Sequence, residues 1–160
     1  MQGRNLTWFV TGVICCFLLT ACAHDTYQQR ADVIKDHTEA FYTHLKANRV
    51  EAAIRENEQI EAMASDMGRT VRKRASLRGA TPVEREFALM KTAKEAAATN
   101  WLALGQYFAI KKQYAQARAT YQRILHTYDH ETDRPYREQA ARAIEDLNIL
   151  DPPSASATTP

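Results

Sequence analysis

The chain has 160 residues and a formal net charge of +2, a length that suits a single domain. The nearly balanced charge argues against general nucleic-acid binding. Only five Gly and five Pro interrupt the chain, whose central part is rich in Ala, Glu, Lys, Arg, Gln and Leu. Because these residues lose little side-chain freedom in a helix, an all-α fold is expected.

The first 22 residues differ in composition from the rest. A short basic start precedes an almost uncharged apolar stretch at 6–21. This stretch is shorter than the roughly 20 residues of a membrane-spanning helix and fits the core of an export signal. It ends in Leu-Thr-Ala-Cys at 19–22, which resembles the lipobox of bacterial lipoproteins. The alternatives are an ordinary cleaved signal peptide and a short membrane anchor with an incidental cysteine.

The lipobox resemblance implies that 1–21 is a signal peptide and that Cys22, the first mature residue, carries a covalent lipid such as palmitate. No other cofactor is expected. Ala23 stands where an Asp would retain such a protein in the inner membrane, which favours an outer-membrane protein facing the periplasm. Because Cys15 and Cys16 lie in the leader, the mature chain would have one cysteine and no intramolecular disulfide.

The mature chain is predicted to contain five helices. After a tether at 22–27, apolar residues recur every three or four positions, which is the spacing of one helix face. The predicted helices span 28–47, 50–77, 82–112, 114–128 and 135–150, so that 28–150 forms the domain. The tail 151–160 is expected to be disordered because it has almost nothing to bury.

Local signals set these boundaries, and the apolar positions predict the core. A break at 48–49 separates the first two helices, and 79–82 is the clearest interior stop. Thr81 can cap the third helix, and Pro82 suits its first position. The inward residues expected are Ala31, Ile34, Thr38, Phe41, Leu45, Ala53, Ile54, Ile60, Met63, Met67, Phe87, Met90, Ala97, Trp101, Leu104, Phe108, Ala117, Tyr121, Ile124, Leu125, Tyr136, Ala140, Ile144 and Leu147.

The segment 101–124 resembles one tetratricopeptide repeat (TPR). The residues that carry the resemblance are Trp101, Leu104, Gly105, Phe108, Tyr114, Ala117, Tyr121 and Ile124. Small Gly105 and Ala117 should let two antiparallel helices approach closely, with aromatic rings around the contact. The resemblance implies antiparallel helical hairpins in a short right-handed solenoid with a protein-binding surface. The alternative is a plain short helical bundle with a coincidental match.

The chain also departs from the family pattern. The proline that usually closes a repeat is expected near Asp129, but Pro135 comes later, so 129–134 should be a longer loop. Tyr136 follows Trp101 at about one family period of roughly 34 residues, which makes the last helix an unfinished repeat. Only one repeat matches well, and the junction at 45–54 resembles a worn one.

One basic run stands out among the polar candidates. It consists of Arg69, Arg72, Lys73, Arg74 and Arg78. The run is either a solvated helix end, where cations are favoured, or an anion-binding patch. In an envelope protein the anion would be a lipid head group, a lipopolysaccharide phosphate or an acidic partner.

No metal site or enzymatic activity is expected. His126 and His130 could share a helix face but lack the intervening Glu of a metalloprotease helix, and His37 and His44 lack a third ligand. Glu56, Glu58 and Glu61 have the pattern of a solvated helix face. No Ser-His-Asp order, glycine-rich phosphate loop or pair of catalytic carboxylates stands out.

The expected function is therefore that of an envelope lipoprotein, anchored through Cys22, that acts as a TPR-like adaptor or assembly factor for an unidentified envelope protein. The alternative function is a binding module for an anionic envelope ligand, acting through 69–78. Nucleic acid is not an expected partner.

Overall fold

The computed structural model describes residues 26–76 and 83–152, and these two ranges are helical and contain no strand. A first helix spans 26–46. It is followed by α2 (Val50–Ala75), α3 (Val83–Ile110), α4 (Tyr114–Thr127), a short 3-10 helix η1 (Glu131–Asp133) and α5 (Arg134–Leu150). The predicted all-α fold with about five helices is confirmed.

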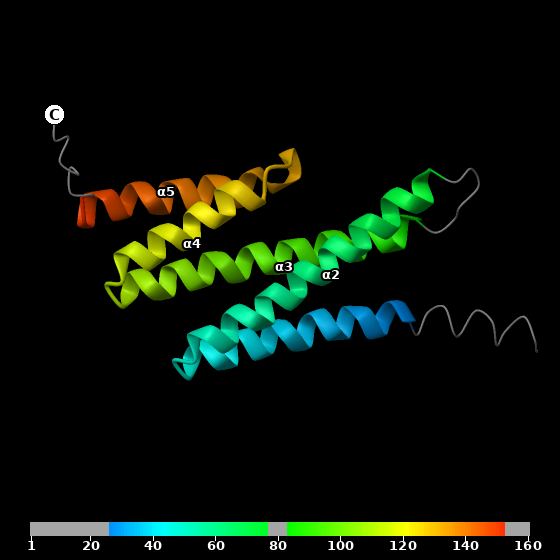
Figure 1. Ribbon diagram of the computed structural model, residues 1–160, viewed down its shortest axis with the longest axis horizontal. Coiled ribbons are helices and arrows are strands. Elements are labelled where there is room, and N and C mark those ends of the chain that lie inside the picture. The colour runs from blue at the N-terminus through cyan, green and yellow to red at the C-terminus, as the bar shows by residue number, and fades with distance from the viewer. Residues whose placement is uncertain (1–25, 77–82, 153–160) are drawn as a thin grey trace, which may run out of the picture.

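Consecutive helices run antiparallel, and α3 is the central element (Figure 1). It packs against α2, α4 and α5. Because α3 has 28 residues and α4 only 14, α4 covers only half of α3. Figure 1 shows α2 and the other half of α3 extending together beyond α4 and α5. This difference in length leaves part of α2 and α3 uncovered by α4 and α5.

The core consists of two clusters that meet along α3. The larger one joins the C-terminal half of α3, including Trp101 and Leu104, to α4, α5 and the junction between the first helix and α2. The smaller one joins Leu89 and Ala93 on the N-terminal half of α3 to Ile34 and Ile60 on the first helix and α2. Each half of α3 is thus held by a different set of neighbours.

A pair of buried amides lies on the α2–α3 contact. Asn57 and Asn100 are almost completely buried. The Asn100 amide donates to Asn57 Oδ1 at 2.9 Å, and the Asn57 amide donates to the Ala97 carbonyl at 3.1 Å. A sliding movement of the helices would leave these groups without partners, so the pair fixes the register of α2 on α3.

Two tight turns have the same backbone geometry. Asn48 and Lys112 each have φ 58°, and the amide after each donates to a carbonyl five residues back. This is the left-handed C-terminal cap of a helix. One TPR period of roughly 34 residues holds two helices joined by a turn. The stretch between these two turns is nearly two periods long but is taken up by the two long helices α2 and α3. A regular array of such repeats therefore does not account for α2 and α3.

Most predicted boundaries are accurate to within two residues. The predicted tether is wrong at 26–27, which are helical, because Tyr27 packs against the smaller core cluster. The third helix ends at Ile110 because Lys112 leaves the helical conformation. The predicted loop 129–134 contains η1, and α5 starts within it.

Several predictions fall outside the described residues: the signal peptide 1–21, Cys22, Arg78, the stop at 79–82 with its capping residues, and the tail from 153 onward. Asp151 and Pro152 follow α5 without helical structure. In the two described ranges, no helix has both the length and the apolar composition needed to cross a membrane.

Candidate functional site

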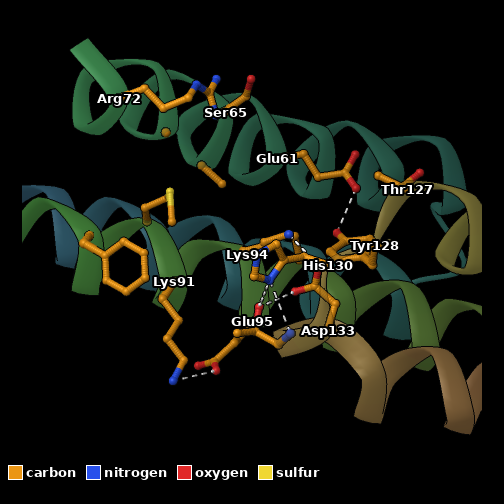
Figure 2. Close-up of a pocket in the computed structure, with 16 residues that line it drawn as sticks. Glu61, Ser65, Arg72, Lys91, Lys94, Glu95, Thr127, Tyr128, His130 and Asp133 are labelled. Carbon is orange, nitrogen blue, oxygen red and sulfur yellow. Dashed lines mark hydrogen bonds and ion pairs between the residues drawn. The ribbon is translucent and has the colours of Figure 1, made fainter. Parts of the chain in front are cut away.

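A groove of about 510 Å³ opens where α2 and α3 extend beyond α4 and α5. We call it the α2–α3 groove (Figure 2). Its two sides come from α2 and α3, and the segment after α4 closes one end. The lining residues are Glu61, Ala64, Ser65, Gly68, Arg72, Phe87, Met90, Lys91, Lys94, Glu95, Ala97, Thr127, Tyr128, His130, Thr132 and Asp133.

Phe87 and Met90 form the apolar part of this groove. Phe87 was predicted to face inward, and this is wrong: it is 49% exposed. The reason is that α4 and α5 end before they reach this turn of α3. Across the groove, Gly68 has no side chain, and a Cβ there would stand 3.3 Å from Met90 Sδ. The groove therefore offers an aromatic ring and an adaptable thioether to a ligand.

Glu61 organises the closed end of the groove. Its Oε1 accepts hydrogen bonds from Trp101 Nε1 at 2.7 Å and from the Tyr128 hydroxyl at 2.8 Å, and Oε2 pairs with Arg123 at 2.7 Å. The Arg123 guanidinium also lies 4.2 Å from the centre of the Trp101 ring. The interpretation of Glu61 as part of a solvated face is wrong, since its carboxylate joins α2 to α3 and α4.

A second buried contact fixes the segment after α4. Lys94 on α3 pairs with Asp133 at 2.5 Å, and the Asp133 side chain is 6% exposed. Figure 2 shows Lys94, Tyr128 and Asp133 converging at this end. Burial raises the pKa of Tyr128 well above its ordinary value, and the neighbouring negative charge of Glu61 adds to the effect. The segment that closes the groove is thus held to both of its sides, by Tyr128 to α2 and by Asp133 to α3.

The raised pKa of Tyr128 predicts a loss of stability at alkaline pH. Unfolded tyrosine ionises at its ordinary pKa of 10.0, whereas folded Tyr128 stays protonated. This residue should therefore leave the free energy of unfolding unchanged below that pH and lower it above, by up to about 1.4 kcal/mol per pH unit. Urea unfolding from about pH 9 to pH 11 should show a shallower decline in Tyr128→Phe. An equal decline of the free energy of unfolding in Tyr128→Phe and wild type would contradict a raised pKa of Tyr128.

The residues of the basic run lie in different surroundings. Arg72 lines the groove, Arg69 pairs with Asp66 at 3.2 Å, and Lys73 and Arg74 are exposed on the last turns of α2. Among the described residues, Arg72 has no carboxylate partner. The run is therefore partly the solvated helix end and partly a groove wall.

The TPR-like residues meet in the larger core cluster. Trp101, Leu104, Phe108, Ala117, Tyr121 and Ile124 are buried there, and Tyr114 packs against it. A Cβ on Gly105 would stand only 2.4 Å from Tyr121 Cε1. The absence of a side chain at Gly105 thus lets α3 and α4 approach closely, as the sequence suggested. These residues shape the scaffold, and none of them except Tyr121 lines a described hollow.

The histidine pairs do not form a metal centre in the described part of the chain, where no cluster of three or more His, Cys, Asp or Glu has suitable geometry. His37 pairs with Glu56 at 2.6 Å, and His44 lies 3.9 Å from the same carboxylate, so Glu56 links the first helix to α2. His126 is on α4, whereas His130 accepts from the Thr132 amide at the start of η1.

Comparison with protein-family models, with curated proteins and with solved structures finds no match to this chain. The feature of the described residues that bears most on function is therefore the α2–α3 groove. Sequence reasoning did not identify this groove. Two features of the sequence pointed toward it: the aromatic Phe87 near a basic run, and the unequal lengths of the predicted third and fourth helices.

Proposed function

We propose that this protein is an envelope lipoprotein that binds another envelope protein and holds it at a membrane. The observation that carries the proposal is the α2–α3 groove, in which Phe87 stays exposed between two long helices. Its closed end is preorganised by Glu61 and Lys94, which lowers the entropy that binding must overcome. Such a groove suits recognition of a polypeptide segment.

Two further features support the adaptor function. The contact between Gly105 and Tyr121 matches the helix packing that the TPR resemblance implies for 101–124. The lipobox at 19–22 suggests that Cys22 is acylated, which would anchor the domain to a membrane. With Ala23 in the next position, the outer membrane facing the periplasm is the proposed location. The mechanism is recognition plus localisation, without chemical turnover or a cofactor beyond the lipid.

The alternative is a binding module for an anionic envelope ligand. The partner-free Arg72, with exposed Lys73 and Arg74 beside it, favours this function among the described residues. On this account a lipid phosphate or a lipopolysaccharide phosphate occupies the basic end of α2. The two functions differ in whether apolar Phe87 contributes to binding.

The adaptor function predicts one recurrent envelope protein after mild crosslinking and purification from native membranes. Recovery should fall several-fold in Phe87→Ser, because the apolar anchor is removed, and in Cys22→Ala, because the anchor to the membrane is lost. The matched control is Ile110→Ser, since Ile110 is 74% exposed on the same helix but outside the groove. Equal recovery with Phe87→Ser and wild type would contradict the proposal. Quantitative mass spectrometry provides the measurement.

A further inference from the structure

The charges of the α2–α3 groove restrict what it can bind. Its carboxylates are engaged: Glu61 with Arg123, Asp133 with Lys94, and Glu95 with Lys91 at 3.8 Å. Lys91 and Glu95 are 58% and 47% exposed, so this last pair is weak. Arg72 has no such partner among the described residues. After internal pairing, the open part of the groove keeps one cation without a carboxylate partner among the described residues, Arg72, and one weakly paired cation, Lys91.

The cations and the apolar residues occupy the same stretch of the groove. Arg72 lies one turn beyond Gly68 on α2, and Lys91 directly follows Met90 on α3. In Figure 2, Arg72 lies on the α2 side of the groove, whereas Lys91 on the α3 side extends away from α2 toward Glu95. A ligand whose apolar side chain contacts Phe87 and Met90 is therefore adjacent to the cation on α2, and Lys91 can meet it by leaving its weak pair with Glu95.

The rest of the lining favours a polypeptide over a lipid. Ser65, Thr127 and Thr132 line the groove. Ser65 Oγ accepts from Arg69 and Thr132 Oγ1 donates to Asp133, and the remaining lone pairs of such hydroxyls can accept hydrogen bonds from peptide amides. The groove runs between two long helices, α2 and α3, whose side chains repeat with each turn as those of a bound helical segment do.

We propose that the α2–α3 groove binds a partner segment in which an apolar side chain is flanked by carboxylates. The apolar side chain packs on Phe87 and Met90, and the carboxylates pair with Arg72 and Lys91. This inference rests on the proposed adaptor function and adds the chemical class of the partner. Charge complementarity of this kind mainly determines which partners are accepted and how fast they associate.

Fluorescence anisotropy with the purified full chain tests the inference. Three labelled helical peptides share one leucine-rich face and carry Glu, Gln or Lys at all other positions. The Glu peptide should bind about tenfold more tightly than the Gln peptide, and the Lys peptide should bind most weakly. In Arg72→Gln, the preference for the Glu peptide over the Gln peptide should fall to about twofold. Phe87→Ser should weaken the binding of both peptides. Arg142→Gln, which changes an exposed arginine on α5, is the matched control.

Three results would overturn the inference. If the Gln or Lys peptide binds as tightly as the Glu peptide, and Phe87→Ser weakens that binding, the groove remains a protein-binding site but its acidic preference is wrong. If no peptide binds and Phe87→Ser also leaves co-purification unchanged, the adaptor function fails as well. If phosphatidylglycerol vesicles bind through Arg72 while all three peptides fail, the surface recognises lipid phosphate.

Discussion

Gly105→Ala is expected to lower the free energy of unfolding by about 2 kcal/mol, whereas Gly68→Ala should leave it unchanged or raise it by up to about 1 kcal/mol. Both glycines are buried within long helices. A new Cβ on Gly105 would stand 2.4 Å from the Tyr121 ring, which is itself 5% exposed and enclosed by the larger cluster. On Gly68 it would meet the flexible Met90 thioether at 3.3 Å.

Urea unfolding of the two variants, followed by circular dichroism, measures this difference. A double-mutant cycle with Tyr121→Leu gives the control, because the smaller side chain should reduce the cost of Gly105→Ala. If Gly105→Ala is as stable as Gly68→Ala, the ring moves aside freely and close packing of α3 on α4 is not what holds the hairpin together.

Glu61→Ala is expected to lower the free energy of unfolding by about 3 kcal/mol. The substitution leaves the Trp101 indole N–H, the Tyr128 hydroxyl and the Arg123 guanidinium without their shared acceptor. Buried donors without a partner are costly because water cannot replace the lost bond. The closed end of the groove should loosen at the same time, so binding of the Glu peptide should also weaken.

Glu58→Ala is the matched control, since Glu58 is also on α2 but is 48% exposed and lies 4.0 Å from Arg123. Its effect should stay within about 0.5 kcal/mol. Glu61→Gln should be intermediate, because an amide oxygen still accepts hydrogen bonds but carries no charge for Arg123. Chemical denaturation measures all three variants. Equal stabilities of Glu61→Ala and Glu58→Ala would show that the three contacts are replaced by water at little cost.

The helices could be predicted from the sequence because their signals are local. Apolar residues such as Ile34, Phe41 and Leu45 repeat at helical spacing and are all buried. Asn48 is a residue type that tolerates positive φ, so the first turn was recognisable. Lys112 adopts the same φ without belonging to such a type, and the predicted helix was accordingly too long there.

The groove could not be predicted in the same way because it depends on long-range packing. Phe87 belongs to an apolar face by spacing, and its exposure follows only from where α4 and α5 end. The partners of Glu61 are 40, 62 and 67 residues away in the sequence, so its spacing within α2 resembles that of any solvated carboxylate. The close approach of α3 and α4 at Gly105 could be predicted because both helices lie within one short segment of the sequence.

The most direct test of the central claim, that the α2–α3 groove binds another envelope protein, is site-specific photocrosslinking in intact membranes. A photoreactive amino acid replaces Phe87 in one protein and Ile110 in the other. Both positions are exposed on α3, but only Phe87 lines the groove. We predict one discrete protein adduct from position 87 and none from position 110. Identical adducts from both positions, or adducts from position 110 alone, would contradict the account.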